Sequence, residues 1–173
     1  PTWSEVTALG LYALAAAPAS ANLDPDAQQT ALTSILGGAA HLLALREASG
    51  ARVGLGPEHF VWGSNGVVAS TGMMLVIASQ LDPEKNPNYL PAALDIADYL
   101  LGRNGTGYSY ITGFGTLSPT QPHHRPSAAD VVAAPVPGWL VGGPNPGRQD
   151  NCPGYMGTTL AAGRLGWEVV GIR

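Results

Sequence analysis

The residues with the clearest chemical potential lie in residues 109–125 (SYITGFGTLSPTQPHHR), where His123, His124 and Arg125 directly follow Pro122. Histidine can donate hydrogen bonds to hydroxyl groups, and the planar guanidinium of arginine can hold a carboxylate or bridge two hydroxyls. Adjacent side chains point to different sides of an extended chain, so we expect the two histidines to have different tasks. The same residues also fit a loop-packing feature that binds no ligand.

A metal centre is the less favoured use of these histidines. No third histidine or cysteine stands at ligand spacing from His123 and His124. Cys152 is the single cysteine of the chain, which excludes both an internal disulfide framework and a zinc site built from several cysteines.

The surrounding segment has an unusual composition. Residues 104–154 contain 9 glycines and 8 prolines, and their only charged residues are Arg125, Asp130, Arg148 and Asp150. A loop of this length is rare in a compact domain and is usually functional when it occurs. The sequence therefore predicts a long structureless loop rich in glycine and proline that carries the site.

Helices must position this loop. Apolar periodicity and turn signals predict helices over about 3–17, 25–48, 64–81 and 88–101, the second beginning after Asp24 with proline at its first position. The third is nearly uncharged, so we expect it to be buried on most sides. The fourth has Leu90, Leu94, Ala97 and Leu101 on one face, with Asp95 and Asp98 on an opposite face that we interpret as solvated.

Composition limits the class of protein. The 173 residues are 45% hydrophobic and 12% charged, which favours one folded domain over a disordered chain. The formal net charge is −4 and Lys85 is the single lysine, so nucleic acid is a poor partner. No apolar stretch is long enough to suggest a membrane span. The chain begins at Pro1 without methionine, and we expect its true N-terminus to be missing.

The stretch 109–115, followed by 122–125, resembles the first active-site signature of family 9 glycoside hydrolases, the cellulases. It fits at every specified position except Leu117, where the family usually has Lys, Arg or Asn. The resemblance covers about residues 1–153. The flanking motifs that agree with the family are Trp3 in TWSEV, WGSN at 62–65, DYLLGRN at 98–104 and PGWLVGGPN at 137–145.

This resemblance implies an all-α fold, an incomplete (α/α)6 barrel of about four helices with a long active-site loop rich in glycine and proline. Residues 1–173 would form a single partial catalytic domain. Within it, 1–103 are expected to be helical, 104–154 to form the active-site loop region, and 155–173 to be a tail of uncertain structure. Four helices are about a third of a twelve-helix double barrel, so inner helices should expose apolar faces meant for missing neighbours.

The resemblance also implies a function, the hydrolysis of β-1,4-glucosidic bonds in cellulose or related β-glucans with inversion. His123 and Arg125 match the signature residues expected to hold the sugar beside the cleaved bond. The neighbouring His124 and the aromatic residues Trp3 and Trp62 are implied to bind substrate, since flat indole rings suit the apolar faces of sugars. Trp139 and Trp167 we interpret as ordinary core aromatics.

The expected partners follow from that substrate. They are β-1,4-glucan, as cellulose or cello-oligosaccharides, and the missing parts of the same barrel, with no nucleic acid and no membrane. Polymeric cellulose cannot enter a cell, so we expect a secreted protein. We expect no cofactor and no metal site: calcium occurs in the family, but the carboxylates here lack the spacing of oxygen ligands.

Inverting hydrolysis needs a general base and a general acid. In the family these are an Asp in an Asp-Ala-Gly-Asp motif and a Glu in an Asn-Glu motif, and neither motif occurs in these 173 residues. Glu168 does not match the acid. We therefore expect a cellulase fragment, or a reading frame shifted near residue 154, that alone hydrolyses no glucan.

Two other interpretations remain open. One is a degenerate, catalytically silent module that retains a glucan-binding cleft. The other is a helical interaction protein, which the 51-residue loop region at 104–154 disfavours because a structural array has no need of it.

Overall fold

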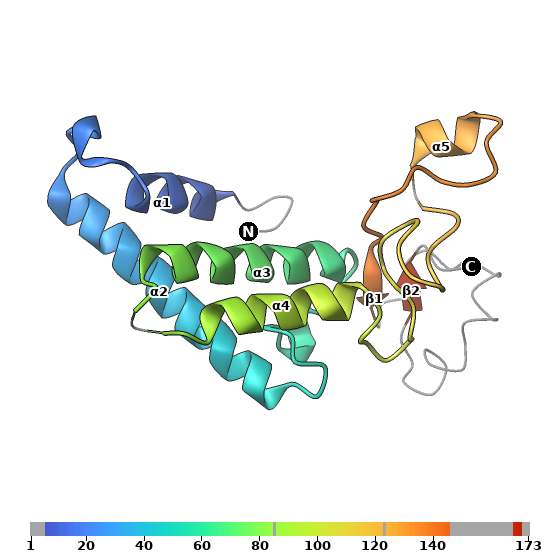
Figure 1. Cartoon of the computed structure of the whole chain (residues 1–173), viewed down its shortest axis with the longest axis horizontal. Coiled ribbons are helices and arrows are strands. Elements are labelled where there is room, and N and C mark those ends of the chain that lie inside the picture. The colour runs from blue at the N-terminus through green and yellow to red at the C-terminus, as the bar shows by residue number, and fades with distance from the viewer. Residues whose placement is uncertain (1–5, 85, 123, 146–167, 171–173) are drawn as a thin grey trace. The chain divides into compact units, whose positions relative to one another are not determined.

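The structure is a computed structural model that describes residues 6–84, 86–122, 124–145 and 168–170. Helices dominate these residues (Figure 1). None of the described helices is both long enough and apolar enough to cross a membrane. The elements are α1 (Thr7–Ala15), α2 (Pro25–Ala48), α3 (Ser64–Leu81), α4 (Tyr89–Leu100), α5 (Arg125–Ala129), two 3-10 helices (Ala19–Ala21 and Pro57–His59), β1 (Gly143–Asn145) and β2 (Glu168–Val170).

The long helices agree closely with the sequence pattern. Helix α2 begins after Asp24, whose carboxylate accepts a hydrogen bond of 3.0 Å from the backbone nitrogen of Asp26, and Pro25 stands at its first position. Helices α2 and α3 have the predicted bounds. Helix α4 is one residue shorter at each end than predicted, and α1 ends at Ala15.

Contacts divide the chain into two compact units, the first formed by Pro1–Gly54 and Val68–Ile96, the second by Leu55–Val67 and Ala97–Arg173. In the first unit, glycines let helices approach closely. A Cβ atom added at Gly72 of α3 would lie 3.1 Å from the Cγ2 atom of Ile96 on α4. The buried apolar residues that α2, α3 and α4 contribute to this unit are Ala31, Ile35, Ala39, Val68, Leu75, Ala78, Tyr89, Ala92, Ala93 and Ile96.

The face that α4 buries is not the one that carries Leu90 and Leu94. Leu90 and Leu94 are 50% and 58% exposed, whereas Ala92, Ala93 and Ile96 are buried. Small and β-branched side chains allow a closer helix approach than leucine does, and packing therefore selects the alanine face. The predicted apolar face with Leu90 and Leu94 is therefore exposed in this structure.

Helix α3 departs from its prediction on one face. Val68, Leu75 and Ala78 are fully buried, but Met73 and Val76 on the same helix are exposed. Most residues of α3 are thus buried or half-buried, and the exception is the face that carries Met73 and Val76.

Leu90 and Leu94 lie one helical turn apart, and their exposure leads to an expectation for the isolated chain. We expect it to associate with itself, because burying each leucine is worth about 1.5–3 kcal/mol. Sizing chromatography should give a mass above the monomer, and the double variant Leu90→Gln/Leu94→Gln should move it towards the monomer. Val131→Gln, at a fully exposed valine outside the helices, serves as the control. A monomeric wild-type chain with a sharp cooperative melt would contradict this expectation.

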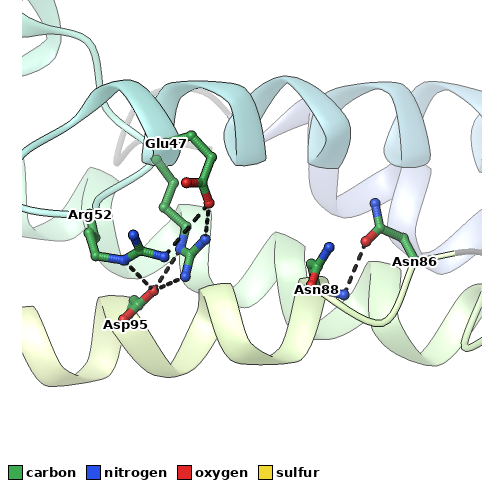
Figure 2. A network of polar contacts seen from close by, with 6 residues as sticks. Glu47, Arg52, Asn86, Asn88 and Asp95 are labelled. Carbon is green, nitrogen blue, oxygen red and sulfur yellow. Dashed lines mark hydrogen bonds and ion pairs between the residues drawn. The ribbon is translucent and has the colours of Figure 1, made fainter.

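A network of charged residues joins α2 to α4 in the first unit (Figure 2). The Nε atom of Arg46, in the last turn of α2, donates to Asp95 Oδ2 of α4 at 2.6 Å, and Arg46 also contacts Glu47. Arg52 donates through Nε to the same Asp95 oxygen at 3.2 Å. The Asp95 side chain is only 20% exposed, so its interpretation as part of a solvated face is wrong.

This network should make the stability of the chain depend on pH. Burial raises the pKa of Asp95, but the hydrogen bonds and charges of Arg46 and Arg52 outweigh burial and leave that pKa below its ordinary value. The carboxylate then stabilises the fold above the ordinary Asp pKa of about 3.9, and this contribution is lost as the pH falls through the lower pKa of the folded state.

We therefore expect the free energy of unfolding, measured in urea, to fall as the pH drops below about 4. The fall should be smaller in Asp95→Asn, which has no carboxylate to protonate at this position. An equal fall in both proteins would show that Asp95 does not contribute to it.

The second unit contains most of the loop region. β1 pairs with β2 in an antiparallel register that places Gly143 opposite Val170 and Asn145 opposite Glu168 (Figure 1). An isolated antiparallel bridge joins Ile111 to Leu140. With α5 and β1 inside it, the loop region is not structureless, because backbone pairing between its two halves satisfies groups that a bare loop would leave to water.

Candidate functional site

A buried threonine holds the two halves of the loop region together. Thr112 is fully buried and uses its backbone and its hydroxyl at once. Its backbone nitrogen donates to the carbonyl oxygen of Trp139 at 2.9 Å, and its Oγ1 accepts from the backbone nitrogen of Trp139 at 2.9 Å. The same hydroxyl donates to the carbonyl oxygen of Val136 at 2.6 Å, and the Thr112 carbonyl accepts from Gly138 at 2.8 Å. The backbone on both sides of Trp139 is thereby fixed.

The first residues of α3 hold the 141–145 segment, which follows Trp139 in the loop region. Asn65 donates from its backbone nitrogen to Gly142 O and from Nδ2 to Val141 O, each at 3.0 Å. Ser64 Oγ donates to Pro144 O at 2.7 Å. Ser64 and Asn65 are both fully buried, so these contacts form in the interior of the unit. Two residues of the WGSN motif therefore position the 141–145 segment.

His124 is held at the beginning of α5. It is the N-cap residue, its Nδ1 lies 2.8 Å from Ser127 Oγ, and it accepts a 3.4 Å hydrogen bond from the Ser127 backbone nitrogen. Its imidazole ring lies over the indole of Trp139, with ring centroids 4.1 Å apart and planes tilted by 32°. His124 and Trp139 are 15 positions apart in the sequence, and the fold brings them together.

The other predicted site residues differ in their position and in whether the structure describes them. Arg125 begins α5 and is exposed, so its guanidinium can reach a ligand. Trp62, which precedes α3 by two positions, is 48% exposed, as a surface that stacks on sugar requires. His123 and Trp3 lie outside the described residues.

The interpretation of Trp139 as a core aromatic is wrong. The residue is 43% exposed. The neighbouring Pro137-Gly138 turn, where Gly138 has a φ of +94°, could have suggested an exposed position. The contact with His124 has no local sequence signal. Trp167, interpreted in the same way, lies outside the described residues.

Tyr99 of α4 and Tyr110 of the loop region pack edge to face, with ring centroids 5.6 Å apart. Burial raises the pKa of both phenols above the usual value, so both stay neutral at neutral pH. Among the described residues, no group of three His, Cys, Asp or Glu side chains could hold a metal ion. The arrangement is suited to holding an uncharged, hydroxyl-rich ligand by aromatic faces and by guanidinium and imidazole donors.

Comparison with known proteins gives consistent matches. The chain is 61% identical over 62 residues to the xyloglucan-specific endo-beta-1,4-glucanase BoGH9A of Bacteroides ovatus, covering 36% of this chain and 11% of that protein. It is 37% identical over 150 residues to endoglucanase D of Acetivibrio thermocellus, covering 86% of this chain and 23% of that protein. The structure of AaCel9A in complex with cellobiose-like isofagomine matches with a TM-score of 0.70 and 35% identity, over 81% of this chain and 26% of that one.

Each of these matches covers only part of the relative. The chain spans only between 11% and 26% of the length of these three proteins. Its helices correspond to part of an (α/α)6 barrel, which confirms the predicted fold class. The model of the family described as glycosyl hydrolase family 9 matches residues 3–158, which is most of the sequence. The chain therefore belongs to glycosyl hydrolase family 9.

Proposed function

We propose that the protein hydrolyses β-1,4-glucosidic bonds in cellulose or related β-glucans with inversion, and that these 173 residues supply the side that holds the substrate. The observation that carries the proposal is the exposed Arg125 at the start of α5, beside His124, in a loop that Thr112 holds in place. Membership of a family of glycosidases, with endoglucanases among the relatives, supports the same substrate class.

In this proposal the residues divide the work of binding. Arg125 and His123 hold the sugar next to the cleaved bond, and a guanidinium can donate to two hydroxyls at once. Trp62, Trp3 and His124 are assigned to substrate binding, as the resemblance to the family implies. The ligand is uncharged, so hydrogen bonds and stacking supply the affinity, and no cofactor is required for either.

The proton transfers of hydrolysis need two carboxyl groups that the substrate-binding residues named above do not supply. An inverting glycosidase uses two carboxyl groups roughly 6.5–9.5 Å apart, each typically worth 10²–10⁴-fold in rate. Neither an Asp-Ala-Gly-Asp nor an Asn-Glu motif occurs in these 173 residues. We infer that the chain alone binds glucan weakly and does not hydrolyse it. The second candidate function, a silent glucan-binding module, rests on the same observation.

The proposal extends to the setting of the reaction. Polymeric cellulose cannot enter a cell, so the protein would act outside it. Its other partner would be the remainder of the barrel, against which exposed apolar residues such as Leu90 and Leu94 would pack.

The test combines hydrolysis with binding. The purified chain is incubated with cellohexaose and the products are separated by chromatography, with calorimetry measuring cellohexaose affinity in parallel. We expect no hydrolysis above background, and an affinity that Arg125→Ala lowers about tenfold, as expected for a lost charge-assisted hydrogen bond. Arg103→Ala, which removes the same charge elsewhere in the second unit, should leave the affinity unchanged.

Two results would contradict the proposal. A rate close to that of an intact cellulase, retained after contaminants are removed, would overturn the inference that the chain alone is inactive. Equal affinities of the Arg125→Ala and Arg103→Ala variants would remove Arg125 from the binding site.

A further inference from the structure

We infer that Trp139 is a sugar-stacking platform that binds one glucosyl ring of a β-1,4-glucan. This inference rests on the proposed function and adds to it a residue with its ligand. A single exposed apolar side chain needs no explanation in a soluble protein, so exposure alone does not carry the inference. The inference rests instead on the contacts that hold the backbone and the indole of Trp139 in place.

The backbone of Trp139 is already ordered. Its backbone N–H and C=O are both bonded to Thr112, at 2.9 Å each, and Thr112 is fully buried. The exposure of the indole is therefore not that of a side chain on a frayed loop. A ligand that lands on a fixed ring loses less free energy to ordering than one that must immobilise a loose ring.

The indole is also supported from one side. The His124 imidazole lies 4.1 Å from it between ring centroids, and Ser127 holds that imidazole through Nδ1. With its indole against His124, Trp139 is still 43% exposed. A flat, rigid, partly covered aromatic surface with an open side is what stacking on a sugar requires.

The ligand class follows from chemistry. The glucosyl rings of a β-1,4-glucan carry equatorial substituents, so each ring offers flat C–H faces and its hydroxyls point outwards around the edge. The indole matches such a face in size and polarity. Arg125 directly follows His124, so hydrogen-bond donors for the hydroxyls lie next to the residue that supports the platform. An α-1,4-linked chain curves and presents its successive rings at changing angles, so it should fit less well.

The test uses the purified 173-residue chain and cellotetraose as the probe. The indole N–H signals are followed by nuclear magnetic resonance during titration, and Trp139→Phe identifies the signal of Trp139. We expect this signal to shift saturably with cellotetraose and to move far less with maltotetraose. Trp139→Ala should weaken cellotetraose binding about tenfold, Trp139→Phe by less, and the control Val132→Ala, an exposed apolar residue of the same unit, should leave it unchanged.

Each other outcome has a distinct meaning. Binding of cellotetraose with an unmoved Trp139 signal and an unchanged affinity in Trp139→Ala would overturn this inference and leave the proposed function standing. An equal response to maltotetraose would overturn the β-1,4 ligand class. Absence of any cellotetraose binding would overturn the platform and the proposed function together. If Trp139→Ala fails to fold, the wild-type titration and the milder Trp139→Phe variant still decide.

Discussion

Replacing Gly143 with alanine is expected to destabilise the chain by about 3 kcal/mol, because two separate costs combine at this position. Gly143 has a φ of +89°, a region in which a residue with a Cβ atom costs roughly 1–2 kcal/mol. The added Cβ would lie 2.4 Å from both Cγ and Oδ1 of Asn65, which is fully buried. Asn65 would have to move, and its hydrogen bond to the Val141 carbonyl would be lost at a further cost of about 1–3 kcal/mol.

Urea unfolding of the variant measures this loss. Gly66→Ala is the matched control, because Gly66 immediately follows Asn65 in α3 and an added Cβ there meets nothing within 4 Å. That control should be neutral or should stabilise by up to about 1 kcal/mol, since alanine favours the helix over glycine. If Gly143→Ala is no more destabilising than Gly66→Ala, the beginning of α3 does not hold the 141–145 segment as described.

A second large destabilisation, of about 2–3 kcal/mol, is expected for Asp95→Asn. Removing one partner of a fully buried pair costs about 3–5 kcal/mol, and the remaining exposure of Asp95 reduces that figure. The change leaves Arg46, whose side chain is 11% exposed, without the carboxylate that neutralises it. The asparagine can still accept a hydrogen bond, but it cannot compensate the guanidinium charge.

Asp98→Asn provides the control for this variant on the same helix. Asp98 is exposed and lies 4.0 Å from Arg103, so its loss should cost no more than about 0.5 kcal/mol. Unfolding midpoints in urea give both values under the same conditions. Equal effects of the two substitutions would mean that the buried network does not join α2 to α4.

Local signals in the sequence were sufficient for the bounds of α2 and α3. The Asp24-Pro25 pair places the start of α2, and the apolar periodicity of residues 64–81 places α3, because capping and periodicity depend on neighbouring residues. The buried face of α4 was not predictable in this way. Asp95 accepts a hydrogen bond from Arg46, which lies 49 positions earlier in the sequence, and this long-range contact places Asp95 against α2.

The same distinction between local signals and long-range contacts applies to the residues of the candidate site. The motif at 109–125 pointed to His124 and Arg125, and the structure places both at the start of α5. It could not point to Trp139, whose contact with His124 depends on Thr112 bringing two halves of a loop together across 27 positions. Long-range hydrogen bonds made by one buried hydroxyl cannot be predicted from sequence periodicity, because periodicity reports only on residues close in the sequence.

The most direct test of the account is a calorimetric titration of the purified chain with cellohexaose and, separately, with maltohexaose. We expect saturable binding of cellohexaose, weak at a dissociation constant on the order of 0.1–1 mM because only part of the barrel is present, and no measurable binding of maltohexaose. Absence of cellohexaose binding, or equal binding of the two sugars, would contradict the claim that this loop region recognises β-1,4-glucan.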